Sequence, residues 1–263
     1  MEKTFDIIIL AILQGIAEFL PVSSSGHLVL GQHLLGLKVP GITLEVALHA
    51  GTLLATLAYY RNALLRIVKG LFSGSRESLQ LALNIIVSAI PAVLFYLLFK
   101  KRIEGAFEDP RTIGVALLFT GIILLGLRWV PSREEGVSFW RALFIGLAQA
   151  VAVLPGVSRS GMTISAARLS GISPEKAAEF SFLASIPLIA GAMLKKTLES
   201  FLETPSPEAG TLSPLHLIMG ICISAIVGYF ALSFLVKTLR GRYFWCFGIY
   251  CILAGCCTFL FIR

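Results

Sequence analysis

The chain has 263 residues, of which 56% are hydrophobic and 14% are charged, and its formal net charge is +7. Its mean hydropathy is +0.85; a soluble domain, with about 25% charged residues, is excluded, and one membrane domain over residues 1–263 is expected. The basic excess is typical of cytoplasmic loops, and the lack of interleaved basic and aromatic residues argues against a nucleic-acid partner.

The predicted elements form two similar series along the chain. The first is a broken apolar stretch, Phe5–Leu37, followed by three runs long enough to span a bilayer: Ile42–Tyr60, Ser78–Phe99 and Thr112–Val130. The second is a broken stretch, Phe139–Ile172, followed by the runs Ala177–Met193, Ser213–Val236 and Phe244–Ile262. Irregular backbone at membrane depth is tolerated only inside protein or beside a wet cavity, so the two breaks are the expected functional places.

Loop charges predict how the spans are oriented. The loops expected in the cytoplasm carry Arg61, Arg66, Lys69 and Arg76 in one case, and Lys237, Arg240 and Arg242 in the other. The loop expected outside carries Glu199, Glu203 and Glu208. If the six spans alternate, both ends of the first broken stretch lie outside and both ends of the second lie inside. Each broken stretch is therefore predicted to be a re-entrant hairpin.

An internal repeat relates the two series. A shift of 135 positions carries Gln14 onto Gln149, Ser23 onto Ser158 and Gly26 onto Gly161, and it also aligns the spans. Because each hairpin is followed by an odd number of spans, the second half is inverted in the membrane. The predicted fold is an all-α polytopic membrane protein with an inverted-topology repeat, about residues 1–130 and 136–263. Each half comprises a re-entrant helical hairpin plus three transmembrane helices.

The first hairpin carries candidate acid, base and hydroxyl groups. Gln14 and Glu18 are four residues apart and share one helix face. An ionisable residue within a membrane is costly, so Glu18 and His27 are functional candidates. The hydroxyls of residues 23–25 need a nearby base to act as nucleophiles, and they could instead only satisfy the freed backbone. Gln14 and Glu18 also offer hard oxygen ligands for Mg²⁺ or Ca²⁺.

The second hairpin carries a candidate anion clamp. Arg159 takes the place of Ser24, and its planar fork of donors matches phosphate oxygens. The glycines of both breaks can open a helix whose N-terminal amides favour an anion. The predicted phosphate-binding residues are Ser23, Ser25, Gly26, Ser158, Ser160, Gly161 and Thr163. Together the two hairpins supply the groups that phosphoryl transfer requires: a nucleophile, a proton carrier and a cation that stabilises the charged phosphoryl oxygens.

These motifs resemble a known family. Gln14-x-x-x-Glu18 followed by Phe-Leu-Pro-Val-Ser-Ser-Ser-Gly-His27, with Pro155-Gly-Val-Ser-Arg-Ser-Gly161 and Thr163, is similar to the bacitracin-resistance family of undecaprenyl pyrophosphate phosphatases over nearly the whole chain. The resemblance implies hydrolysis of undecaprenyl pyrophosphate to undecaprenyl phosphate and inorganic phosphate. That reaction recycles the lipid carrier for peptidoglycan synthesis and confers bacitracin resistance.

The resemblance also implies the setting of the reaction. It implies a divalent cation, Mg²⁺ or Ca²⁺, a polyprenyl pyrophosphate lipid as substrate, and a multi-pass protein of the bacterial cytoplasmic (inner) membrane with its site towards the outer face. A homodimer is left open. Glu18, Ser24, His27 and Arg159 carry over as catalytic residues, and the nucleophile stays open between Ser24, water and His27. Gln14 stands where many members have Glu. Since an amide cannot act as a base and is a weaker metal ligand, both roles fall mainly to Glu18. His49 is assigned no chemistry.

Two alternative functions fit parts of the pattern. Inverted repeats with broken helices also form transporters, so a transporter or flippase of an anionic polyprenyl phosphate lipid is the main alternative. The cluster of Glu18, serines and His27 favours an enzyme over a transporter, because binding alone does not require an acid, a base and hydroxyls together. An intramembrane serine protease is a weaker alternative, because Arg159 has no clear place in peptide hydrolysis.

Overall fold

The structure is a computed structural model that describes residues 2–34, 41–107, 109–131, 133–202, 212–240 and 243–261. Within these ranges the chain forms eleven α-helices and one 3-10 turn. They are α1 (Glu2–Ala17), α2 (Ser24–Leu34), α3 (Gly41–Tyr59), α4 (Arg61–Phe72), α5 (Arg76–Ala106), α6 (Pro110–Gly126), η1 (Leu127–Trp129), α7 (Phe139–Val151), α8 (Arg159–Leu169), α9 (Pro174–Leu202), α10 (Pro214–Arg240) and α11 (Cys246–Phe261). The predicted positions Leu37, Glu203, Glu208, Arg242 and Ile262 lie outside the described residues.

The predicted all-helical class is confirmed. The six predicted spans correspond to α3, α5, α6, α9, α10 and α11. Four segments are long and apolar enough to cross a membrane: Arg76–Ala106, Arg111–Trp129, Pro174–Glu199 and Pro214–Arg240. The apolar parts of the other two, Leu44–Tyr59 and Cys246–Leu260, are shorter. Large apolar side chains on the outside, such as Leu98 and Phe230, give the helices a surface suited to lipid.

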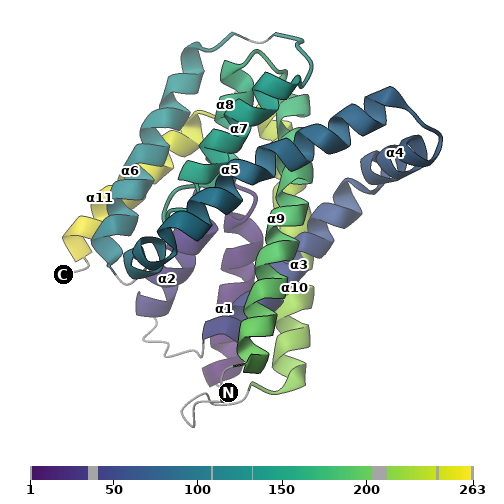
Figure 1. Ribbon diagram of the computed structural model, residues 1–263. Coiled ribbons are helices and arrows are strands. Elements are labelled where there is room, and N and C mark those ends of the chain that lie inside the picture. Colours follow the sequence, from purple (N-terminus) through teal and green to yellow (C-terminus); the bar gives the residue numbers. More distant parts are fainter. Residues whose placement is uncertain are drawn as a thin grey trace.

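Each predicted break separates two short helices. Residues 18–23 join α1 to α2, and residues 152–158 join α7 to α8. Proline has no amide donor and disfavours helix in the residue before it, so Pro21 and Pro155 favour the interruptions. Pro91 and Pro187 lie inside α5 and α9, so proline alone does not end a helix here. Ser23 and Gly156, with φ of 70° and 87°, also turn the chain out of the helical conformation in the two breaks. Figure 1 shows α1 and α2 in the lower half of the bundle and α7 and α8 in the upper half. The two broken segments therefore approach the middle of the molecule from different ends.

The segment after α3 was expected to be a loop, and that expectation is wrong. Residues 61–72 form the amphipathic helix α4, which packs against the start of α5. Ala63 is buried, and Leu64 and Ile67 pack against the main core, while the basic residues face outward. Figure 1 shows α4 and the start of α5 projecting from the bundle. The Arg and Lys residues of this segment indicated a loop, but the apolar residues between them recur at helical spacing.

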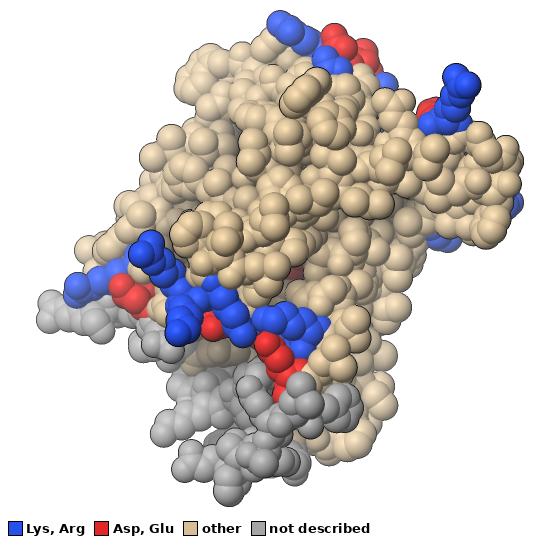
Figure 2. Space-filling view, in the orientation of Figure 1, with Lys and Arg blue, Asp and Glu red and all other residues tan. Residues whose placement is uncertain are grey.

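Helix pairs distant in sequence hold the bundle together. The closest packing joins α3 to α10, α6 to α11, α5 to α7 and α1 to α10. In the core the rings of Phe19 and Phe182 lie 5.6 Å apart between centroids, so the first hairpin packs directly on α9. Figure 2 shows charged residues in two zones separated by a broad uncharged surface. That distribution is the one expected of helices whose ends meet water and whose middles meet lipid.

Candidate active site

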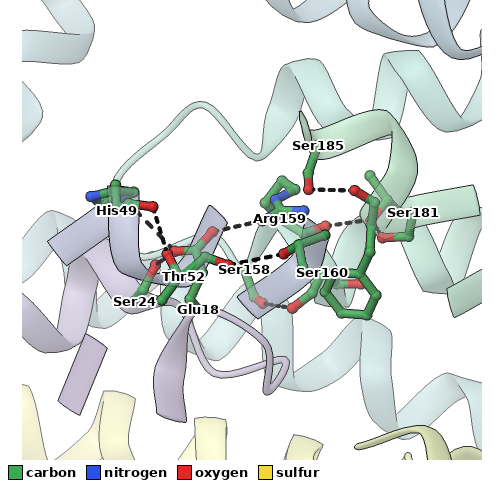
Figure 3. A network of polar contacts seen from close by, with 12 residues as sticks. Glu18, Ser24, His49, Thr52, Ser158, Arg159, Ser160, Ser181 and Ser185 are labelled. Carbon is green, nitrogen blue, oxygen red and sulfur yellow. Dashed lines mark hydrogen bonds and ion pairs between the residues drawn. The ribbon is translucent and has the colours of Figure 1, made fainter. Parts of the chain in front are cut away.

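An ion pair joins the two hairpins. Arg159, the first residue of α8, donates from Nη2 to Glu18 Oε1 over 2.6 Å. Glu18 directly follows α1 and its side chain is 7% exposed, against 18% for Arg159. Figure 3 shows the two side chains reaching toward each other from different segments. Because both charges are largely removed from water, removing either one would leave the other uncompensated.

The other oxygen of the Glu18 carboxylate binds two neighbours in the first hairpin. The hydroxyl of Ser24 donates to Oε2 over 2.7 Å, and the amide of Gln14 donates to the same oxygen over 3.1 Å. Ser24 is the first residue of α2, and Glu18 directly follows α1. The hydrogen bond between them therefore joins the two helices of the first hairpin. A hydroxyl bonded to a carboxylate is the arrangement of a nucleophile with its general base.

A cavity of about 290 Å³ opens beside this ion pair. Its polar lining comprises Glu18, Ser23, Ser24, Ser25, Glu45, His49, Ser158, Arg159, Ser185 and Lys196. Its apolar lining comprises Ala17, Val46, Phe107, Ala152, Val153, Val157, Leu188, Ile189, Ala192 and Met193. Residues from both broken segments therefore line one cavity. Since the first residues of α2 and α8 both line it, two helix N-termini with their favourable dipoles lie beside the cavity.

The serines that precede α2 and α8 cap these helices in the same way. Ser23 Oγ accepts from the amide of Gly26 over 3.3 Å, and Ser158 Oγ accepts from the amide of Gly161 over 3.1 Å. Capping of this kind satisfies amides that have no helical partner. Ser23 adopts a φ of 70°, in the left-handed region that costs energy for any residue with a side chain. Strain of this kind clusters at functional sites.

Four of the predicted phosphate-binding residues do not line the cavity, namely Gly26, Ser160, Gly161 and Thr163. Ser160 instead donates to the carbonyl oxygen of Leu20 over 3.3 Å, which ties the second hairpin to the first. The hydroxyls of Thr163 and Ser181 are 2.6 Å apart, which ties α8 to α9. The hydroxyls of Ser160 and Thr163 therefore fix the positions of the segments that surround the cavity.

His27 lies outside the cavity, although it belongs to the first motif. Its Nδ1 is 2.9 Å from the carbonyl oxygen of Ser23, and its Nε2 is 2.6 Å from the hydroxyl of Tyr250. A carbonyl oxygen only accepts, so Nδ1 is the donor and the neutral ring has both nitrogens occupied. His27 lines a separate, mostly apolar groove that includes Leu13 and Phe247.

His49 is the imidazole that faces Glu18, and the sequence analysis missed it. Its Nε2 lies 3.8 Å from Glu18 Oε2, while its Nδ1 lies 2.9 Å from the carbonyl oxygen of Glu45. Thr52 donates to the carbonyl oxygen of His49 over 3.1 Å (Figure 3). Residues 45, 49 and 52 follow the spacing of one helix face, so the signal was available. The paired motifs do not include His49, so a search for those motifs alone does not find it.

The polar groups beside Glu18 include oxygen ligands for a divalent cation. Among the described residues no three or more His, Cys, Asp or Glu side chains form a group that could hold a metal. Gln14 Oε1, however, is buried without a hydrogen-bond partner in the part of the chain that the structure describes. Mg²⁺ is commonly bound through one or two carboxylates together with substrate phosphates. Glu18 offers such a carboxylate in the lining of the cavity. Gln14 is fully buried and does not line the cavity, and it adds an amide oxygen next to Glu18.

Comparisons with known proteins agree with the motifs. A family model described as "Bacitracin resistance protein BacA" matches residues 7–257. An "Undecaprenyl-diphosphatase" of Moorella thermoacetica is 39% identical over 256 residues, which cover 94% of each chain. A protein of the same description from Carboxydothermus hydrogenoformans is 39% identical over 261 residues, 96% of this chain and 95% of the relative. One from Geobacter metallireducens is 40% identical over 265 residues, 97% and 96% of the two chains.

Proposed function

The chain belongs to the bacitracin resistance protein BacA family, and from this premise we propose that it is an undecaprenyl-diphosphatase whose reaction takes place beside Glu18 and Arg159. It hydrolyses undecaprenyl pyrophosphate to undecaprenyl phosphate and inorganic phosphate. The reaction recycles the lipid carrier for peptidoglycan synthesis and confers bacitracin resistance. The observation that carries this assignment is the carboxylate of Glu18, which binds a candidate nucleophile, Ser24, and a candidate phosphate clamp, Arg159, with different oxygens.

Ser24 is the proposed nucleophile. Its Oγ forms a bond to the terminal phosphorus, its proton passes to Glu18 Oε2, and the bond from that phosphorus to the bridging oxygen breaks. Undecaprenyl phosphate leaves with the bridging oxygen. Glu18 gives that proton to the bridging oxygen as it leaves and is a carboxylate again. Water then attacks the phosphorus of the phosphoserine and passes a proton to Glu18. The bond from phosphorus to Ser24 Oγ breaks, Oγ takes the proton back from Glu18, and inorganic phosphate is released. The 2.7 Å hydrogen bond between Ser24 and Glu18 supports the transfer of the Ser24 proton to Glu18.

Arg159 is the proposed clamp for the terminal phosphoryl group. Its Nη1 is buried and has no hydrogen-bond partner among the described residues, so it offers an unused donor. Its guanidinium carbon lies 5.9 Å from the centroid of the Phe182 ring, which limits how the planar group can turn. A fixed donor beside the N-termini of α2 and α8 stabilises charge that develops on the phosphoryl oxygens.

Gln14 and Glu18 are the proposed protein ligands of a divalent cation, Mg²⁺ or Ca²⁺. The cation, when bound, neutralises charge on the pyrophosphate oxygens. Gln14 contributes its unpartnered amide oxygen, which is a weaker ligand than a carboxylate. Glu18 keeps its role as base through the oxygen that faces Ser24.

The catalytic role of His27 remains a prediction. Both of its ring nitrogens have partners outside the cavity, so its contacts support a structural contribution to the hairpin. The imidazole that we assign to the site is His49. Its Nε2 lies 3.8 Å from Glu18 Oε2, so the ring faces the carboxylate from α3.

The inverted repeat is supported by the way in which the helices pair. The shift that carries α1 onto α7 also carries α5 onto α10, and the structure packs α1 on α10 and α7 on α5. A Cβ built on Gly26 would lie 3.2 Å from Gly156 Cα, and one on Gly161 would lie 3.3 Å from Pro21 Cβ. The same shift exchanges these two contacts. We therefore propose two re-entrant hairpins that meet about a pseudo-two-fold axis.

The site is proposed to face the outer side of the bacterial cytoplasmic membrane. In the orientation that the loop charges predict, the C-terminal parts of α5 and α9 lie outside, and the cavity reaches Phe107 and Lys196 at those ends. The apolar residues of α9 along the cavity, from Leu188 to Met193, offer a surface for the start of the prenyl chain. A homodimer is left open.

Phosphate release in detergent tests this function. The purified protein should release inorganic phosphate from C55 or C15 prenyl diphosphate in the presence of Mg²⁺ or Ca²⁺. Release should stop when EDTA is added and return when the cation is restored. A folded protein that binds the lipid diphosphate but leaves it intact with either cation would contradict the proposal. That result would favour a transporter or flippase of an anionic polyprenyl phosphate lipid.

A further inference from the structure

A second ion pair lines the same cavity, between α3 and α9. Lys196 donates from Nζ to Glu45 Oε2. The side chains of Lys196 and Glu45 are 39% and 31% exposed, whereas those of Arg159 and Glu18 are 18% and 7% exposed. The cavity therefore has a buried cation–carboxylate pair at its inner end and a more exposed pair at its outer end.

The two pairs lie close enough to act on one ligand. Glu45 is one helical turn from His49, roughly 6 Å along α3, and His49 Nε2 lies 3.8 Å from Glu18 Oε2. Arg159 and Lys196 are the two Arg or Lys side chains that line the cavity in the described part of the chain. The wall of α9 between them is apolar, and charges beside apolar walls interact more strongly than in open water.

A lipid diphosphate carries two phosphoryl groups, and the proposed function gives a partner only to the terminal one. The other stays attached to the lipid, remains anionic, and needs a counter-charge wherever water is partly excluded. We propose that Lys196 leaves Glu45 when substrate binds and contacts the phosphoryl group that stays on the lipid. This inference rests on the proposed function and deepens it, because it assigns one cation to each phosphoryl group.

Little free energy is needed for Lys196 to exchange Glu45 for a phosphoryl group. An ion pair with both side chains about one third exposed contributes little to stability, because water and salt screen it. Lysine carries its charge on a flexible four-carbon stem with three donors, so it can turn from a carboxylate to a phosphoryl oxygen. Glu45 competes with the phosphoryl group for this cation. It therefore weakens the binding of substrate and of the lipid monophosphate product.

Lys195 provides a matched control on the next residue of α9. Its ammonium contacts the hydroxyl of Tyr96 over 2.6 Å and pairs with Glu199, and it does not line the cavity. With C15 prenyl diphosphate, Lys196→Met should raise KM about tenfold, the cost of one charge-assisted contact, and leave kcat within about threefold. Lys195→Met should leave both constants within about twofold.

Product inhibition identifies the phosphoryl group that Lys196 contacts. In Lys196→Met, competitive inhibition by C15 prenyl monophosphate should weaken about tenfold, as KM does. Inhibition by inorganic phosphate, which binds at Arg159, should stay unchanged. If inhibition by inorganic phosphate weakens and inhibition by prenyl monophosphate does not, the assignment is overturned.

A double variant separates loss of contact from repulsion by an unpaired Glu45. If Lys196 contacts substrate, KM stays raised in Glu45→Gln/Lys196→Met, and Glu45→Gln alone lowers KM. A return of the double variant to the wild-type KM would mean that Lys196 only neutralises Glu45, and would overturn the inference. No turnover by folded wild type would defeat the proposed function. Normal wild-type turnover with an unchanged KM in Lys196→Met would defeat this inference alone.

Discussion

At the scale of single residues, Glu18 organises the site. One oxygen binds the Arg159 guanidinium of the second hairpin, and the other accepts from Ser24 and Gln14 of the first. This division keeps the carboxylate ionised beside a hydroxyl in a place from which water is largely excluded. A base that is buried, paired and bonded to a nucleophile is preorganised, so little rearrangement is needed when the phosphoryl group arrives.

Ser24→Ala tests the nucleophile. The variant should lose at least about 100-fold in kcat, because no other hydroxyl is bonded to Glu18 among the described residues. Its KM should change little, since Arg159 still holds the phosphate. Ser185→Ala is the control, because Ser185 lines the cavity but donates to the carbonyl oxygen of Phe182. Undiminished turnover in Ser24→Ala would assign the attack to water.

At the scale of elements, the two hairpin turns decide how closely the halves approach. Gly156 adopts a φ of 87°, and a Cβ added there would lie 2.8 Å from both Ala116 Cβ and Ile113 O. Neither the backbone angle nor the space admits a side chain. The turn of the second hairpin therefore packs closely against α6. The position of Arg159, three residues later, depends on this packing.

Gly156→Ala should destabilise the protein by about 1–3 kcal/mol, through backbone strain together with overpacking. Thermal unfolding in detergent measures the loss, and activity should fall with it because the clamp moves. Gly191→Ala is the control, since a Cβ at Gly191, inside α9, meets nothing within 4 Å. Equal melting temperatures for the two variants would show that the turn is not tightly seated.

Much of this element-scale picture follows from sequence patterns alone. Long apolar runs and Pro-containing breaks have direct physical meanings, and the helices α3, α5, α6, α9, α10 and α11 occur where the runs predict them. The sequence predicts that Glu18 and Arg159 serve one site because both lie in the breaks, but it does not predict that they form an ion pair. The places of His49 and Lys196 could not, because packing of α3 and α9 on the hairpins decides them, and no local pattern reports packing between distant helices.

At the scale of the whole molecule, the distribution of charged residues and the pairing of the helices are both consistent with the proposed membrane fold. The shift that relates the hairpins also relates the helix pairs α1–α10 and α7–α5. Charged residues form two zones on either side of an uncharged surface (Figure 2). At the helix ends, ion pairs such as Lys100–Glu199 and Arg141–Glu135 are accessible to water. The proposed inverted pair of halves, placed in a bilayer, would produce both features.

Cysteine labelling tests the orientation. In a background without the native cysteines, Lys101→Cys should react in intact cells with a maleimide that cannot cross the membrane. Ser73→Cys, at the α4–α5 turn, should react only after the membrane is permeabilised, because loop charge predicts that the basic α4 segment lies in the cytoplasm. Both positions are exposed in the structure, so accessibility is matched. The reverse labelling pattern would show that the cavity opens to the cytoplasm.

The central claim is that both hairpins form one lipid diphosphatase site, and phosphate release by paired variants tests it most directly. Glu18→Ala from the first hairpin and Arg159→Ala from the second should each abolish metal-dependent release from C55 prenyl diphosphate. Arg66→Ala should retain it, because Arg66 pairs with Glu179 outside the cavity. Loss in both site variants with retention in the control is the predicted result. Near-normal release from either folded site variant would contradict the account.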